Sequence, residues 1–145
     1  MTDSIFASWN SRAGEPYESK AGPFFHRELE DGSVIGAFLA DASHVNGIGI
    51  VHGGCLLTLV DYTLFTVVKR AIGDGEAVTV SLSSDFIGAG SAGDLIEAHA
   101  EIIKAGRSMV FARGMVRTAG KTLLSFAGAM KRVKTQPQSP PLSSR

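Results

Sequence analysis

The segment from Gly54 to Ile72 constrains the fold of this chain more than any other. It is apolar around nearly its whole circumference, contains no proline and stops at Gly73, a common residue at the end of a helix. Valine and threonine are frequent in it, so residue propensity alone would also permit a strand. Because the segment is much longer than a typical strand, we expect a long central helix covered on most sides by the rest of the chain.

Short extended runs flank this helix on both sides. Before it, the turn Glu30-Asp31-Gly32 joins two runs into a hairpin. After it come four longer runs, and the short turns at Gly106 and Gly120 predict an antiparallel meander. The expected strands are 24–29, 34–39, 77–86, 95–104, 108–118 and 121–133. We therefore predict the α+β class, with an antiparallel sheet of five to six strands around one long helix.

The two ends of the chain are expected to differ in order. Ile5, Phe6 and Trp9 have helical spacing, which predicts a short amphipathic helix over 3–12, closed by Gly14 and Pro16. We expect one domain over residues 1–133, because 145 residues are too few for two comfortable ones. Residues 134–145 are rich in proline and serine and are expected to be disordered.

Composition excludes several classes of partner. Fourteen basic residues balance fourteen acidic ones, so the chain lacks the charge footprint of a nucleic-acid-binding protein. No apolar run reaches the roughly 20 residues that span a bilayer, and the first residues do not resemble a secretory signal. Cys55 is the only cysteine, which rules out an internal disulfide and is compatible with a reducing compartment. We expect a soluble, cytoplasmic protein that does not insert into membranes.

Two features of the central segment point to chemistry. Asp61 is the only charged residue between Cys55 and Val68, so we expect its carboxylate to be buried. Buried carboxylates are either held by structural hydrogen bonds or functional, and the residues leave both alternatives open. A third alternative, an aspartate that faces solvent on an amphipathic helix, is disfavoured because the residues one turn to either side are mostly apolar. Gly53 and Gly54 open the helix, where free backbone N–H groups favour negative charge and could form an oxyanion hole. A flexible junction between loop and helix is the simpler alternative.

The spacing of Gly53 and Asp61 limits how they could act together. Eight residues of helix separate them by about 12 Å, too far for both to touch one carbonyl group. Across a twofold axis, however, Asp61 of one subunit could face Gly53 of another. An aspartate with an oxyanion hole, and no Ser–His pair at motif spacing, favours water activation or direct carboxylate attack on an acyl group.

The residues before and within the helix form a spaced pattern that consists of Asn46, Gly49, His52, Gly53, Gly54 and Asp61. This pattern resembles the hotdog-fold acyl-CoA thioesterases of the 4-hydroxybenzoyl-CoA thioesterase superfamily, and in particular their phenylacetate-pathway and thioesterase superfamily member branch. The resemblance covers about residues 22–133 and implies a sheet wrapped around the helix. One departure is Ala89, which stands where the family usually has a proline in a loop that borders the acyl-CoA channel.

The resemblance implies a role for each matching residue. The Gly53 N–H would polarise the thioester carbonyl, Gly54 would complete the helix start, and Asp61 of the partner subunit would be general base or nucleophile. Asn46 would hold the water or the carboxylate, and His52 would orient the Asn46 loop. Thr79 lies where the family places a hydroxyl that positions the water; an ordinary strand threonine is the alternative.

For the CoA phosphates, the candidate residues are Lys104, Arg107 and Ser108, together with Lys131 and Arg132. Cys55 has no paired base and is expected to pack as a small apolar side chain. The spacing of His26, His44 and His99 is not that of metal ligands, so we expect no metal and no cofactor. Family members form dimers that pair into tetramers, and the sequence does not choose between the possible pairings.

Two other functions compete with acyl-CoA hydrolysis. A hotdog dehydratase or hydratase would use a histidine in a different signature, which the sequence His52-Gly53-Gly54 and Asp61 argue against. A non-catalytic acyl-CoA-binding protein would leave Asn46 and Asp61 without a reason to accompany the glycines.

Overall fold

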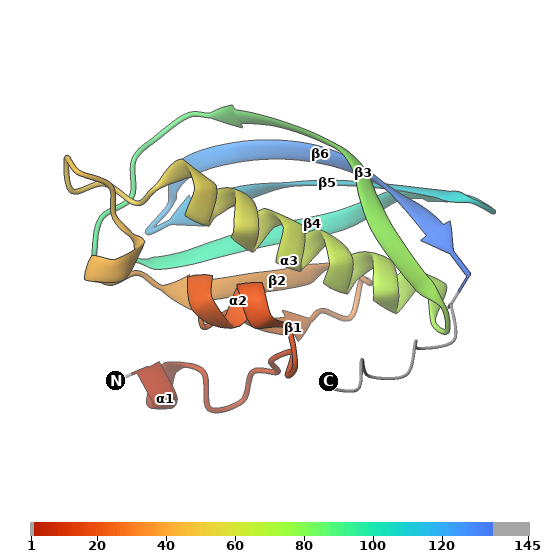
Figure 1. Ribbon diagram of the computed structural model, residues 1–145, viewed down its shortest axis with the longest axis horizontal. Coiled ribbons are helices and arrows are strands. Elements are labelled where there is room, and N and C mark those ends of the chain that lie inside the picture. The colour runs from red at the N-terminus through yellow and green to blue at the C-terminus, as the bar shows by residue number, and fades with distance from the viewer. Residues whose placement is uncertain (1, 135–145) are drawn as a thin grey trace, which may run out of the picture.

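The long helix expected from the sequence is α3, which spans Gly53–Ile72 (Figure 1). The computed structural model describes residues 2–134; Met1 and residues 135–145, which hold nearly all of the expected disordered tail, lie outside that range. Gly73 ends the helix with a positive φ of 68°, a conformation in which glycine is favoured. No helix within residues 2–134 is long and apolar enough to cross a membrane.

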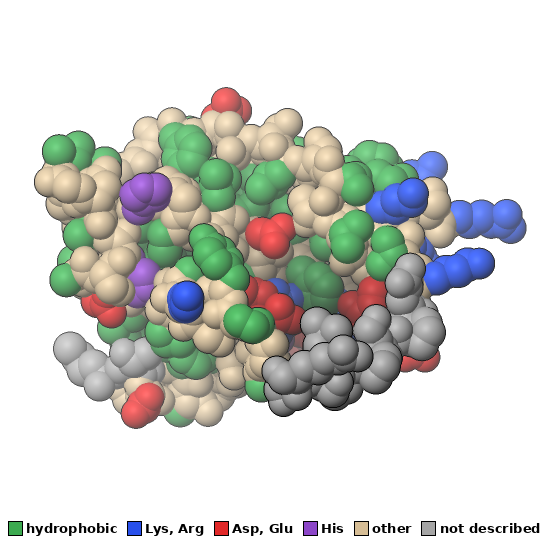
Figure 2. Space-filling view, in the orientation of Figure 1, with side chains coloured by type: hydrophobic (Ala, Val, Ile, Leu, Met, Phe, Trp, Pro, Cys, Tyr) green, Lys and Arg blue, Asp and Glu red, His purple; other side chains and the backbone are tan. Residues whose placement is uncertain are grey.

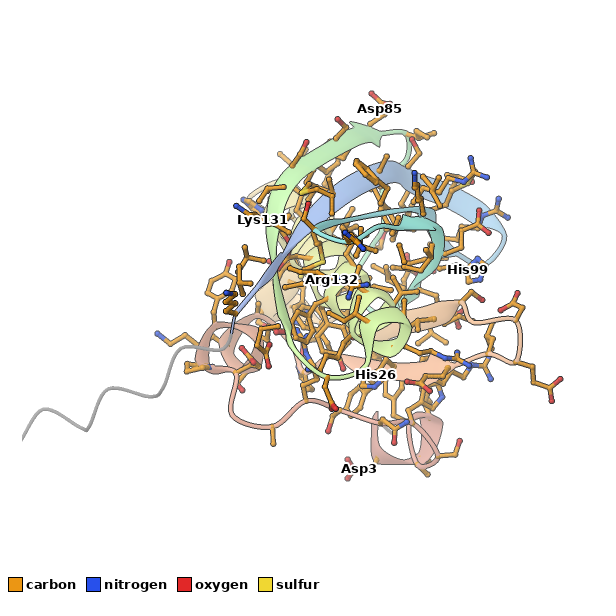
Figure 3. The ribbon with its side chains drawn as sticks, turned by 90° about the vertical axis from the view of Figure 1, so that its right-hand side faces the viewer. Asp3, His26, Asp85, His99, Lys131 and Arg132 are labelled. Atoms are coloured by element: carbon orange, nitrogen blue, oxygen red, sulfur yellow. The ribbon has the colours of Figure 1, made fainter. Side chains whose placement is uncertain are left out.

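One six-stranded antiparallel sheet curls around α3, as the view along the helix shows (Figure 3). The α+β architecture predicted from the sequence is therefore confirmed. Neighbouring strands follow the order β1-β2-β4-β5-β6-β3. Their bounds are β1 Phe25–Glu28, β2 Val34–Leu39, β3 Glu76–Phe86, β4 Leu95–Ala105, β5 Met109–Thr118 and β6 Lys121–Val133.

The position of β3 differs from a simple meander. Strands β4, β5 and β6 follow one another through short turns, but β3 pairs with β6 instead of β4. The other edge of β4 is occupied by β2, so the chain crosses from β3 to β4 through the loop 87–94. As a result, β3 is an edge strand that lies alongside α3.

Small side chains let the sheet approach the helix closely. Ala98 and Ala100 of β4 are fully buried beneath α3, where Leu59 and Val67 are also buried. On β2, a Cβ atom at Gly36 would come within 2.1 Å of the Thr63 hydroxyl, so only glycine permits this contact. The hydroxyl of Thr63 is satisfied by the Leu59 carbonyl one turn earlier.

The N-terminal helix expected over 3–12 is wrong in extent. Helix α1 covers only Thr2–Ile5, and a second helix, α2, covers Pro16–Ala21. The aromatic spacing arises from a turn, because the Phe6 ring stacks on Phe25 of β1 and meets Trp9 edge to face. Pro16 begins α2 and does not close a helix, in line with the preference of proline for a first helical position.

Candidate active site

The start of α3 is closed by His52. Its Nδ1 atom accepts a hydrogen bond of 2.8 Å from the Gly54 N–H, which makes His52 the N-cap of the helix. A Cβ atom at Gly54 would come within 3.0 Å of that ring nitrogen, so glycine suits the position. The Gly54 N–H is thus engaged within the chain, and Gly54 shapes the start of the helix.

The neighbouring Gly53 N–H has no hydrogen-bond partner among residues 2–134. It belongs to the first turn of a 20-residue helix, where N–H groups point outward and carry partial positive charge. The Phe86 ring packs beside Gly53, since a Cβ built there would lie 3.0 Å from Cε1 of that ring. A free, partly shielded donor of this kind suits an oxygen that becomes negative during a reaction.

Asn46 holds the loop that leads into α3. Its side-chain oxygen accepts hydrogen bonds from the N–H groups of Ile48 and Ile50, at 3.1 and 3.2 Å. Farther along, the Val51 N–H donates to the carbonyl of Gly90, so the loop 87–94 supports the approach to Gly53. Asn46 therefore shapes the loop within one chain, and no bond joins it to Asp61 in the described chain.

Asp61 lies on the exposed side of α3, which corrects the expectation of a buried carboxylate. The helix buries most of its circumference and leaves an uncovered stripe that contains Gly54 and Asp61. The Thr79 hydroxyl of β3 donates a hydrogen bond of 2.7 Å to Oδ1 of Asp61. Thr79 therefore orients the carboxylate directly, and no hydrogen bond to the other carboxylate oxygen is present within residues 2–134.

The N-terminal segment forms a wall beside Asp61 that the sequence did not suggest. A cavity of about 270 Å³ contains Asp61 and Thr79 together with Arg12 and Glu18. Arg12 is ion-paired with Glu18, and its guanidinium group lies 4.2 Å from the centre of the Phe65 ring. Burial raises the pKa of Glu18, Arg12 opposes this rise, and the Asp61 carboxylate adds to it. Arg12 and Glu18 lie more than forty residues before Asp61 in the sequence, so no local pattern reveals the contact.

The site residues fall into separate groups within one chain. Asn46, His52 and Gly53 lie at the start of α3, and Asp61 and Thr79 lie about 12 Å farther along the helix. Lys104, Arg107 and Ser108 occupy the end of β4 and the β4–β5 turn, near the opposite end of α3 (Figure 1). Basic side chains gather over this end of the face that carries the helix (Figure 2).

Cys55 and the other histidines have structural surroundings. Burial raises the pKa of Cys55 to about 11, so its side chain is a thiol at neutral pH. His26, His44 and His99 contact Tyr62, Gly22 and Ser33 respectively, in three different places. Within residues 2–134, no three His, Cys, Asp or Glu side chains are grouped so that they could hold a metal ion.

Comparison with known proteins identifies the family of the chain. Residues 48–125 match the family model of the thioesterase superfamily. A Pseudomonas aeruginosa protein named as a putative esterase is 33% identical over 108 residues, which are 74% of this chain and 81% of that protein.

Solved structures share the fold. A mutant of the phenylacetic acid degradation protein PaaI from Thermus thermophilus is 27% identical, with a TM-score of 0.73 over 82% of this chain and 100% of its own. A hypothetical thioesterase of Streptococcus pneumoniae, solved with coenzyme A, has the same fold at 23% identity and a TM-score of 0.71, over 79% of this chain and 88% of its own. The chain therefore belongs to the thioesterase superfamily, a family of hotdog-fold hydrolases.

Proposed function

We propose that this protein is an acyl-CoA thioesterase that works as a homodimer, with each active site shared between two subunits. The observation that carries the proposal is that α3 presents two groups: the Gly53 N–H, which is free among residues 2–134, and the Asp61 carboxylate, which Thr79 orients. Each is suited to thioester hydrolysis, one as an oxyanion donor and the other as a base. Since one helix holds them apart, a second subunit is required to bring them together.

The exposed edge of β3 supports this dimer. The strand has 11 residues, and Val78 and Val80 are 47% and 51% exposed. A long edge strand with apolar side chains tends to pair with another strand, and natural proteins usually cover such an edge. We infer that the β3 strands of two subunits pair antiparallel about a twofold axis, which extends the sheet across the dimer.

This pairing would assemble the site. Along β3, Thr79 contacts Asp61 near one end of the strand, and Phe86 contacts Gly53 at the other end. An antiparallel partner runs in the opposite direction, so its Phe86 end lies beside Thr79. The partner subunit's Gly53 is thereby carried toward Asp61.

In the proposed mechanism, Asp61 takes a proton from a water molecule as that water attacks the thioester carbonyl carbon. The carbonyl oxygen becomes an oxyanion and accepts a hydrogen bond from the partner subunit's Gly53 N–H. Collapse of this intermediate breaks the carbon–sulfur bond. The products are the free acid and CoA, whose thiolate receives the proton that Asp61 had taken.

Direct attack by Asp61 is the second form of this mechanism. The carboxylate would then displace CoA and form a mixed anhydride, which water hydrolyses in a second step. After a single turnover in ¹⁸O-labelled water, label in the Asp61 carboxylate would establish the anhydride form. Label enters the Asp61 carboxylate only if the anhydride forms and water attacks its aspartyl carbonyl, whereas a general base leaves Asp61 unlabelled.

For the CoA moiety, we propose the basic turn of Lys104, Arg107 and Ser108. In the twofold dimer, this turn of one subunit lies toward the α3 start of the other, because the two helices run in opposite directions. Aromatic, medium-chain and long-chain acyl groups all remain candidates for the acyl part of the substrate. The name of the Thermus thermophilus relative favours testing phenylacetyl-CoA first.

A reducing cytoplasm, where a single half-buried thiol stays reduced, is the proposed location.

The test is release of free thiol from phenylacetyl-CoA, benzoyl-CoA and acyl-CoAs of medium and long chain. We expect the wild-type protein to hydrolyse at least one of them and Asp61→Ala to lose that activity while it stays folded and dimeric. Full activity of Asp61→Ala would refute the mechanism. CoA binding without hydrolysis of any thioester would instead favour a non-catalytic binding protein, and hydration of an enoyl thioester would favour a hydratase.

A further inference from the structure

Two cavities meet at the ion pair of Arg12 and Glu18. The first, of about 270 Å³, is the one that contains Asp61 and Thr79, and its apolar lining comes from Phe65, Ala77, Val78 and Met130. The second, of about 160 Å³, is lined mainly by Pro23, Phe24, Phe25 and Tyr62. Arg12 and Glu18 line both cavities. The ion pair therefore stands between the space beside Asp61 and a second, largely aromatic space.

The Arg12–Glu18 pair is held firmly in place. Nη2 of Arg12 donates to both carboxylate oxygens of Glu18, at 2.6 Å to Oε2, and the two side chains are only 17% and 18% exposed. The guanidinium group also lies 4.6 Å from the centre of the Tyr62 ring and 4.2 Å from that of the Phe65 ring. Two residues before Arg12, the backbone pairs with β1. These contacts fix a charged partition over α3.

We propose that the Arg12–Glu18 pair is the end wall of the acyl pocket and limits the length of the acyl chain that the enzyme accepts. The inference rests on the proposed function, because a thioester that reacts at Asp61 brings its acyl group to the first cavity. The apolar side chains there suit an alkyl or aryl group. A chain long enough to reach the pair would have to displace two largely buried charges from each other, which is unfavourable.

The second cavity gives this wall a measurable consequence. If the Arg12 side chain were shortened, the two spaces would be joined, and a longer chain could pass from the first to the second. An alkyl chain gains about fourfold in affinity for each methylene group that it buries. Longer chains should therefore bind more tightly to an opened variant, whereas the wild type should gain nothing from methylene groups beyond the wall.

The test measures binding of S-alkyl-CoA thioethers, from butyl-CoA to dodecyl-CoA, by calorimetry. A thioether cannot be hydrolysed, so the result does not depend on catalysis. For the wild type, we expect the affinity to rise about fourfold per methylene group and then to stop rising at the chain length that reaches Arg12. That chain length is the limit to be compared between variants.

Three variants change the size of residue 12 in one background. Each carries Glu18→Gln, which keeps the size of Glu18 and leaves no unpaired carboxylate, together with Arg12→Met, Arg12→Val or Arg12→Ala. Arg12→Met keeps a long side chain and should keep the wild-type limit. Arg12→Val should extend the limit, and Arg12→Ala should extend it further, by about three methylene groups, or on the order of 50-fold in affinity for the longest chains. Because Arg12→Val already opens the wall, the series decides the question even if Arg12→Ala does not fold.

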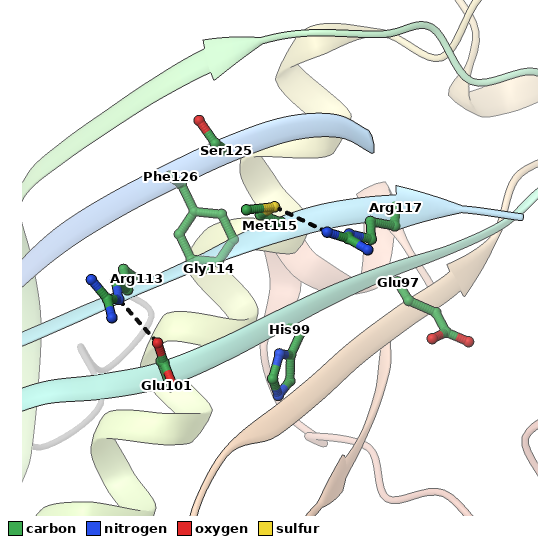
Figure 4. A pocket seen from close by; sticks show the side chains of 9 residues that line it. All are labelled: Glu97, His99, Glu101, Arg113, Gly114, Met115, Arg117, Ser125 and Phe126. Carbon is green, nitrogen blue, oxygen red and sulfur yellow. Dashed lines mark hydrogen bonds and ion pairs between the residues drawn. The ribbon is translucent and has the colours of Figure 1, made fainter. Parts of the chain in front are cut away.

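The matched control is a second Arg–Glu pair, on the outer face of the sheet (Figure 4). Arg113 donates to Glu101 at 2.9 Å there, and neither residue lines either of the two cavities. Arg113→Ala with Glu101→Gln makes the same change of residue types at this place and should keep the wild-type limit. Circular dichroism and molar mass are measured on every variant.

One shared limit for the folded variants at residue 12 would overturn the proposal. A wild-type affinity that keeps rising up to dodecyl-CoA, or a wild type that binds no alkyl-CoA, would also overturn it. Hydrolysis of the matching acyl-CoA series, measured separately, should show the same limits in kcat/KM. A limit that moves with residue 12 in a protein that hydrolyses no thioester would support the wall and refute the proposed catalytic function, so the two failures are distinguishable.

Discussion

The free N–H of Gly53 can be removed with little other change, by Gly53→Pro. Proline is well suited to the first position of a helix, since no hydrogen bond within the helix needs its N–H. The preceding residue must be extended, and His52 already is, with φ −60° and ψ 133°. The substitution should therefore preserve α3 while it removes the proposed oxyanion donor.

The expected loss follows from the value of one such donor. Removal of an oxyanion-hole hydrogen bond typically lowers kcat by about 10²- to 10³-fold, or roughly 3–4 kcal/mol. Gly53→Ala is the matched control, because it adds a Cβ near the Phe86 ring but keeps the N–H. That Cβ would lie 3.0 Å from Cε1 of the ring, the far end of a side chain that can shift by a few tenths of an ångström. We expect Gly53→Ala to lose less than about tenfold.

The assay is steady-state thioester hydrolysis by both variants, with circular dichroism and molar mass measured on the same samples. The reasoning predicts that kcat falls much more in Gly53→Pro than in Gly53→Ala, with KM changed little, because the bond strengthens in the transition state. If the two variants had similar kcat values while both stayed folded and dimeric, the Gly53 N–H would not be the oxyanion donor.

Three further predictions concern other residues. Thr79→Val should lower kcat by about tenfold, because it removes the hydroxyl that orients Asp61, and Thr79→Ser should restore most of it. Hydrogen bonds from Ser43 lower the pKa of Asp41, so Asp41 stabilises the fold above its ordinary pKa of 3.8 and this contribution is lost as the pH falls through the lowered pKa. In thermal unfolding at pH 7, Asp41→Ala should thus have a melting temperature about 2–4 °C below that of the wild type. In strong acid the two melting temperatures should be the same. Alkylation of Cys55 should keep accelerating up to about pH 11, whereas a rate that levels off near its ordinary pKa of 9.0 would contradict burial of the thiol.

The central helix and most of the strands could be predicted because their signals are local. The apolar run after Gly53 and the turns at Gly106 and Gly120 each determine structure within a few residues. The helix predicted over 3–12 from the aromatic residues near the N-terminus was wrong in extent, because Phe6 packs on Phe25, a partner from another element. Spacing along the chain cannot distinguish such a turn from a helix.

The site was predictable in its residue types but less so in its geometry. Asp61 was singled out for its isolation among apolar neighbours, and the burial inferred from them was wrong, because the exposed stripe of α3 is narrow. The contact of Asp61 with Thr79 depends on β3 lying alongside α3, and that follows from sheet order. Arg12 and Glu18 reach the site from an N-terminal segment with no recognisable motif.

The most direct test of the shared active site is complementation between two inactive variants. Asp61→Ala and Gly53→Pro are co-expressed with different tags, and the hybrid dimer is purified through both tags. If each site combines Gly53 of one subunit with Asp61 of the other, the hybrid contains one intact site and one doubly altered site, and it should show about half the wild-type activity. An inactive hybrid, formed from variants that are folded and dimeric, would contradict a site shared between subunits.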